Sequence, residues 1–376
     1  MKPDLLEHAR ETVRVTIVAH QLLEKKIAGC FHALGIQTVL VETARCVRQW
    51  MHARLFGLPG LKVELNDAPT DIYYATVPRQ SAMFVMNQLT EAADLQTPGR
   101  GSIYAQDALE ISPYKLPHIE FDSSSSGSMP YDLTLITAIL SMSGSGEKLA
   151  RIALQLGAGV PVISLGVGTG IRDRLGLLRI TISPEKELVH LMVPAHDADG
   201  LQRLLIEEGH LDRPGGGFIY QTPIRAGLAD HLIRIGRQEH AASIEQIIAA
   251  IDDLKRGTAW RKRFFSMEPV FEKSKQSGDS YREISFVCAD GQEEIFVQAA
   301  MRAGAGGATI SRVRSLNVGD PSKGGNVIRE RGIICVPADL EESVLAALYT
   351  VAKACTDLDW SLQSLEAVSV FSHKRT

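Results

Sequence analysis

Two glycine-rich turns carry the clearest chemistry in this chain. One reads Pro98-Gly99-Arg100-Gly101, and the other reads Pro214-Gly215-Gly216-Gly217. Backbone N–H groups in such turns can converge on an anion, and Arg100 would add a guanidinium fork for oxyanions. The alternative is a tight turn that needs glycine for a positive φ. Because the turn occurs twice in the same sequence context, we predict that these residues contact a ligand: Gly99, Arg100, Gly101, Gly215, Gly216 and Gly217.

A third glycine-rich stretch is Gly166-Val167-Gly168-Thr169-Gly170, which follows an apolar segment. It superficially resembles a dinucleotide-binding fingerprint, but that fingerprint requires a helix directly after the glycines and an acidic residue about twenty positions later. Residues 171–178 are too short for that helix, and the residues after them are typical of a strand. We therefore interpret Gly166, Gly168 and Gly170 as the base of a ligand-binding loop. A nicotinamide-dependent enzyme built on this stretch remains the alternative.

The elements that must position these turns recur along the chain. Val77-Pro78 matches Val193-Pro194, and Ile103-Tyr104 matches Ile219-Tyr220, with a constant spacing of 116 positions (193 − 77, 219 − 103). Hydrophobic periodicity predicts strands and helices in the same order around each match. Strands are expected at 14–19, 36–46, 133–140, 160–165, 178–193, 283–289, 308–314, 327–337 and 361–371, and helices at 22–34, 147–156, 293–302 and 340–354.

This order is β-α-β-β-α-β, the ferredoxin-like plan. The predicted fold class is therefore α+β, with three ferredoxin-like units forming a pseudotrimer. The expected domains are unit 1 at residues 10–120, unit 2 at 131–230, and a degenerate unit 3 at 281–376. Residues 231–280 are predicted to be a linker with an amphipathic helix, whose apolar face carries Ile244, Ile247, Ile248, Ile251 and Leu254.

The composition and charge of the chain disfavour several classes of function. The net charge is −4, which gives no global electrostatic case for binding nucleic acid. The five cysteines are scattered without a CxxC pair, so neither a zinc site nor a disulfide framework is indicated, and a cytoplasmic location is expected. No apolar run reaches the ~20 residues of a membrane span. Catalytic motifs such as GxSxG and HExxH are absent from the sequence, and we expect a protein that is not an enzyme.

The repeated order, the variable loop after the second strand and the glycine turn before the last strand resemble the P-II family of nitrogen-regulatory signal proteins. The second unit is the best match, through GVGTG and DRPGGGFIYQTPI. The third unit keeps the order of elements but lacks the glycine turn. The family lysine that follows the turn is replaced by Ser102 and Phe218.

The resemblance implies signal transduction by nucleotide binding in clefts between units, with three units in one chain replacing three subunits. It implies a small-molecule ligand, with ATP, ADP or AMP as the candidates, and a regulated partner such as a membrane transporter or an enzyme. Because the lysine is missing, AMP, a cyclic nucleotide or bicarbonate stays open beside a triphosphate. An interaction scaffold that binds no nucleotide is the other alternative.

Overall fold

The computed structural model describes residues 9–53, 61–97, 99–120, 129, 132–170, 185–213, 215–230, 280–316, 327–355 and 360–372. We divide these residues into three segments. The first holds β1 (Ala9–His20), a 3-10 turn η1 (Gln21–Leu23), α2 (Glu24–Ala33), β2 (Val39–Ala53), β3 (Leu61–Pro78), α3 (Ala82–Ala93) and β4 (Gly101–Ile111).

The second segment holds β5 (Leu133–Leu140), α4 (Ser145–Gln155), β6 (Val162–Gly170), β7 (Glu185–Pro194), α5 (Ala195–Glu208), β8 (Gly217–Ile224) and β9 (Ala226–Leu228). The third holds β10 (Tyr281–Ala289), α8 (Glu293–Arg302), β11 (Gly307–Ser315), β12 (Ile328–Pro337), η4 (Ala338–Leu340), α9 (Glu341–Ala354) and β13 (Ser361–Ser372). The helix predicted at 293–302 and the strand predicted at 133–140 are confirmed with the same bounds.

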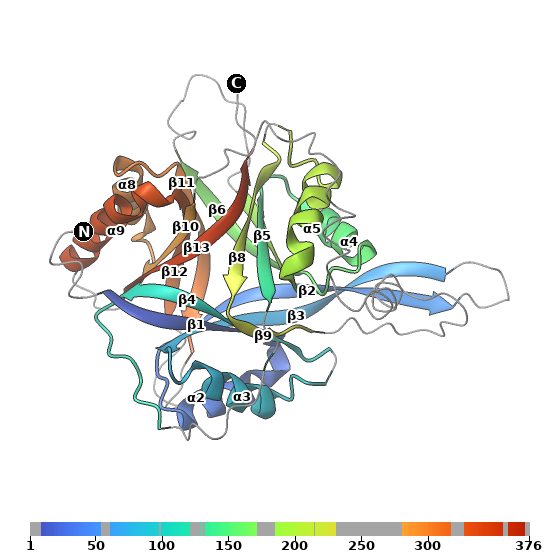
Figure 1. Cartoon of the computed structure of the whole chain (residues 1–376), viewed down its shortest axis with the longest axis horizontal. Helices are drawn as coiled ribbons and strands as arrows, with labels where there is room; N and C mark the ends of the chain where they lie inside the picture. The colour runs from blue at the N-terminus through green and yellow to red at the C-terminus, as the bar shows by residue number, and fades with distance from the viewer. Residues whose placement is uncertain are drawn as a thin grey trace.

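Sequence periodicity explains where the helices form and which face they bury. In α3 the residues Ala82, Val85, Met86, Leu89 and Ala93 recur at helical spacing and are buried. The helices pack in pairs around the outside of the sheet, α2 with α3, α4 with α5, and α8 with α9 (Figure 1). Among the described residues, no helix is long and apolar enough to cross a membrane.

The strands of all three segments belong to one antiparallel sheet of 13 strands. β2 pairs with β6, and β6 pairs with β11, which also pairs with β2. β13 pairs with both β8 and β4, so the sheet closes on itself as a barrel. Within the described ranges, strands contain more residues than helices do, and the helices lie at the periphery (Figure 1).

The predicted fold class, α+β with three ferredoxin-like units forming a pseudotrimer, is therefore wrong. The prediction treated each set of four strands as a separate sheet with its own edges. The unpaired N–H and C=O groups of an edge strand bind any neighbouring strand, and here they join the segments into one closed sheet. The domain boundaries at 10–120, 131–230, 231–280 and 281–376 stay predictions. The amphipathic helix expected within 231–280 lies outside the described residues.

Candidate functional site

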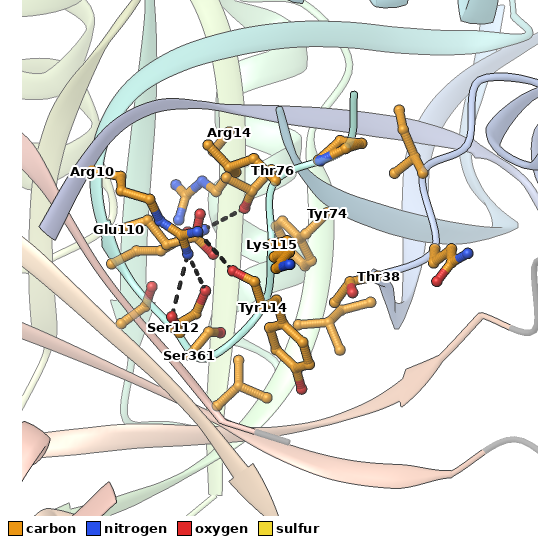
Figure 2. Close-up of a pocket in the computed structure, with 18 of the residues that line it drawn as sticks. Arg10, Arg14, Thr38, Tyr74, Thr76, Glu110, Ser112, Tyr114, Lys115 and Ser361 are labelled. Atoms are coloured by element: carbon orange, nitrogen blue, oxygen red, sulfur yellow. Dashed lines mark hydrogen bonds between the residues drawn. The ribbon is translucent and has the colours of Figure 1, made fainter. Parts of the chain in front are cut away.

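A cavity of about 370 Å³ opens between the first and third segments (Figure 2). We name it the cationic cavity because Arg10, Arg14, Lys115 and Arg331 line it, beside the carboxyl group of Glu110. Its volume lies within the range of small-molecule sites, roughly 300–1,000 Å³. Other polar side chains in the lining come from Gln37, Thr38, Tyr74, Thr76, Ser112, Tyr114, Ser285, Ser361 and Gln363.

Arg10 forms hydrogen bonds with the segment that follows β4 and lines the cavity. Arg10 and Arg14 are four residues apart on β1, so their side chains leave the same face of the strand. Nη1 of Arg10 donates to the carbonyl of Tyr114 at 2.6 Å, and Nη2 donates to Oγ of Ser112 at 2.7 Å (Figure 2). Nε of Arg10 is buried and has no hydrogen-bond partner within the described residues. The exposed Lys115 follows Tyr114 in the segment after β4. Arg10 and Lys115 therefore both lie on the side of the cavity formed by this segment.

A buried ionic network lies behind the cationic cavity and reaches it through Arg14 and Arg331. Nη1 of Arg14 lies 3.1 Å from Oε1 of Glu283, and both side chains are only 4% exposed. Nη2 of Arg14 donates to Oε1 of Gln106 at 2.9 Å, and the Tyr220 hydroxyl donates to Oε2 of Glu283 at 2.8 Å. Burial alone raises the pKa of Glu283, but the charges of Arg14 and Arg331 outweigh it and hold that pKa below its ordinary value. The network thus joins all three segments.

Arg331 extends this network toward Tyr74 and Glu42. Its guanidinium carbon lies 4.5 Å from the centroid of the Tyr74 ring, a cation–π distance, and the Tyr74 hydroxyl donates to Oε2 of Glu42 at 2.9 Å. Nη1 of Arg331 is 3.8 Å from the same Glu42 oxygen, and Nη2 is 3.9 Å from Oε1 of Glu283. These are ion-pair distances and not hydrogen-bond distances, so the guanidinium keeps hydrogen-bonding capacity for a ligand oxygen.

Other buried polar atoms near this network lack a hydrogen-bond partner in the part of the chain that the structure describes. Burial lowers the pKa of His190, which favours its neutral imidazole. Each unpartnered buried polar atom in a folded protein needs an explanation, and a bound water molecule or ion is one. The interior of the closed sheet is therefore suited to a polar ligand or a water molecule. The atoms are Nε of Arg14, Oγ1 of Thr16, Oε1 of Glu42, Oγ of Ser164, Nε2 of His190 and Oγ of Ser311.

The first glycine turn holds an anion that the chain itself supplies. The N–H group of Gly99 donates to Oδ1 of Asp230 at 2.7 Å, and Nη2 of Arg48 donates to Oδ2 of Asp230 at 3.0 Å. Gly99 has a φ of 84°, which favours glycine. Arg100 instead pairs with Asp94 at 3.5 Å on the surface. A Cβ on Gly101 would lie 2.0 Å from the Val18 carbonyl oxygen, so this glycine is required by the β1–β4 pairing.

The second glycine turn has the same backbone constraints at its end. A Cβ on Gly217 would lie 2.5 Å from the carbonyl oxygen of Ile139, and a Cβ on Gly216 would lie 2.7 Å from that of His210. Gly215, with a φ of 79°, has no atom within 4 Å of where its Cβ would stand. Gly215 is therefore the open position of this turn, while Gly216 and Gly217 are needed for close backbone packing.

Gly166, Gly168 and Gly170 lie on β6, and Gly170 is the last residue of that strand. Their role as the base of a ligand-binding loop stays a prediction. Gly170 pairs with Gly307 of β11. A Cβ on Gly166 would lie 2.9 Å from the carbonyl oxygen of Ile310, so its absence lets β11 approach closely. Gly166 also lines a second cavity. The three predicted glycine groups thus occupy three separate places, and none of them lines the cationic cavity.

Sequence reasoning missed the cationic cavity, although a signal for it exists. In the strand ARETVRVTIVAH, Val13, Val15 and Ile17 alternate with a polar face that carries both Arg10 and Arg14. In IRERGIICVP, Arg331 ends a run of three charged residues inside a strand. A charged residue inside a buried strand is costly unless it is paired or binds a ligand, so such residues are candidates for a site.

Comparison with known proteins gives no family. No family model matches the chain, and no curated protein matches it. Two solved structures are weakly similar. GlnK from B. subtilis shares 18% identity with a TM-score of 0.22, over 29% of this chain and 95% of GlnK. Aspartate kinase from Synechocystis shares 10% identity with a TM-score of 0.21, over 95% of this chain and 44% of the kinase. These values are too low to assign a function, which has to be inferred from the site itself.

Proposed function

We propose that this chain is a regulatory protein that binds a small anionic metabolite in the cationic cavity. The observation that carries the proposal is the set of cationic groups with spare hydrogen-bonding capacity at one cavity, above all the buried Nε atoms of Arg10 and Arg14. Arg331 and the exposed Lys115 add two further positive groups. Guanidinium groups in a partly desolvated site bind phosphate and carboxylate strongly.

An adenine nucleotide is the first candidate ligand, and AMP suits the site better than ATP. The cavity volume of about 370 Å³ suits a compact ligand with one anionic group. Arg14 and Arg331 are already balanced in part by Glu283 and Glu42, which leaves little net positive charge for a triphosphate. The regulated partner would be a transporter or an enzyme, which the ligand controls through the loops.

An interaction scaffold that binds no nucleotide at its glycine turns is the second candidate, and the contacts of Asp230 favour it for one turn. A phosphate at Gly99 would have to displace the Asp230 carboxylate from both the Gly99 N–H group and Arg48. A nicotinamide-dependent enzyme is not favoured, because the dinucleotide fingerprint needs its glycines in a turn before a helix. Here they lie within β6, which is paired on both sides.

A thermal-shift panel tests the proposal. The ligands are AMP, ADP, ATP, adenosine and inorganic phosphate, because a ligand that binds the folded state raises Tm. AMP is expected to raise Tm more than adenosine, which lacks the anion. Lys115→Ala should reduce the AMP shift, while Lys26→Ala, an exposed lysine on α2, should not. Equal shifts in both variants, or no shift with any phosphate-bearing ligand, would refute ligand binding at this cavity.

A further inference from the structure

The second cavity, of about 730 Å³, lies between the second and third segments and contains a pair of carboxyl groups. Glu293 and Glu330 line it beside the apolar Leu165 and Val167. Oε2 of Glu330 accepts hydrogen bonds from the N–H groups of Gly291 at 3.0 Å and Glu293 at 3.3 Å, so Glu330 caps the start of α8. Oε2 of Glu293 is buried without a hydrogen-bond partner among the described residues. The pair is therefore incompletely satisfied.

The first segment has the equivalent carboxylate pair, and there a cation completes it. Glu24 begins α2 as Glu293 begins α8, and Asp71 lies on β3 as Glu330 lies on β12. Nη2 of Arg314 lies 2.6 Å from Oε2 of Glu24 and 3.2 Å from Oδ2 of Asp71. One guanidinium group thus binds both acids across the boundary between the third and first segments.

The residue equivalent to Arg314 at the second cavity is Val167. Arg314 on β11 pairs with Val41 of β2. At the boundary between the second and third segments, the same register position is held by Val167 on β6, which pairs with Ile310 of β11. The corresponding residue on β2 is again an arginine, Arg45, which pairs with Ile163 of β6. Two of the three segment boundaries therefore have an arginine at this register position. The third boundary has a valine there, and the second cavity lies at that boundary.

We propose that the second cavity binds a small organic cation, whose guanidinium or ammonium group lies between Glu293 and Glu330. The position corresponds to that of the Arg314 guanidinium in the first segment. The side chains of Leu165 and Val167, which are 68% and 47% exposed, offer an apolar wall for the rest of the ligand. This site is separate from the cationic cavity and selects the opposite charge.

The charge of the Glu330 carboxyl group changes with pH near neutrality. Burial and the hydrogen bond with Glu293 raise the pKa of Glu330 to about 7. A cation binds the ionised pair, so affinity rises with pH up to about 7 and levels off above it, and binding below pH 7 releases a proton. Two further acids and two cations also line the cavity, namely Glu185, Glu187, Lys186 and Arg312. Glu187 accepts hydrogen bonds from the N–H groups of Gly144 and Gly146, and Arg312 pairs with Asp290 at 3.8 Å.

Calorimetric titration with methylguanidinium tests the proposal. One molecule should bind per chain, about tenfold more tightly at pH 8 than at pH 6, as expected for a carboxyl group with a pKa near 7. Glu330→Gln should weaken binding at least tenfold and remove the pH dependence. Glu294→Gln is the control, because this neighbouring acid bonds to Gln298 and does not line the cavity. Equal affinity of the wild type and Glu330→Gln would overturn the proposal.

A second variant supplies the cation within the chain. Val167→Arg should abolish methylguanidinium binding, lower the pKa of Glu330 in a carboxyl NMR titration, and raise Tm by about 2 °C. Val327→Arg is the matched control, since Val327 is similarly exposed (50%) but lies outside the cavity lining. If Val167→Arg folds and still binds methylguanidinium as the wild type does, the cation does not sit between the two glutamates.

Discussion

At the scale of single residues, Asp230 explains what the first glycine turn does. The turn offers a backbone N–H group, as its sequence predicts, and that group binds a carboxylate from the same chain. The side chain of Asp230 is 5% exposed and that of Arg48 is 25% exposed, so their ion pair is shielded from water. The contact ties the end of the second segment to the first.

We expect Asp230→Ala to lower the free energy of unfolding by about 2–3 kcal/mol, because it leaves the Gly99 N–H group and Arg48 without their carboxylate. Asp107→Ala is the control, since its pair with Arg225 is half exposed and should be worth less than about 1 kcal/mol. Urea unfolding measures both. Similar losses in the two variants would mean that the Asp230 contact is not the shielded one described above.

At the scale of elements, sequence periodicity located strands and helices well but could not show how the strands pair between segments. The alternation that buries Val13, Val15 and Ile17 identifies β1 as a strand. Closure of the sheet depends instead on the backbone N–H and C=O groups of edge strands such as β6 and β11. Because every sequence has the same backbone groups, the residue pattern does not reveal this pairing. The glycines of β6 take part in this pairing, which their spacing in the sequence does not indicate.

The element scale also predicts which glycines are indispensable. Gly101→Ala should lower the free energy of unfolding by more than about 2 kcal/mol, because its Cβ would meet the Val18 carbonyl oxygen and its φ is 143°. Gly29→Ala, in α2 with open space around it, should instead raise stability by about 0.5–1 kcal/mol. Thermal unfolding compares the two. A neutral Gly101→Ala variant would contradict the close approach of β1 and β4.

At the scale of the whole molecule, the buried network joins the segments in the interior of the closed sheet. Arg14 comes from the first segment, Tyr220 from the second and Glu283 from the third. The sequence shows these residues inside apolar strands, but their convergence depends on closure and could not be predicted from local patterns. The candidate site was missed for the same reason: Arg10 and Arg331 meet only when β1 and β12 belong to one sheet.

Breaking this network should destabilise the whole chain. Arg14→Met leaves Glu283 buried without its main partner and should cost about 3–5 kcal/mol. Adding Glu283→Met should recover part of the loss, because a pair of apolar side chains carries no uncompensated charge. Urea unfolding followed by circular dichroism should show one transition in each variant. If Glu283→Met destabilised the Arg14→Met variant as much as it destabilises the wild type, the two residues would not be coupled.

The most direct test of the central claim is calorimetric titration of AMP into the wild-type chain and into Lys115→Ala. The claim is that a small anion binds among Arg10, Arg14, Lys115 and Arg331. The predicted result is one AMP per chain with micromolar affinity, weakened roughly fivefold or more by Lys115→Ala, since a charge-assisted hydrogen bond is worth about 1.5–3 kcal/mol and less when exposed. No heat of binding in the folded wild type, or identical affinity in the variant, would contradict the claim.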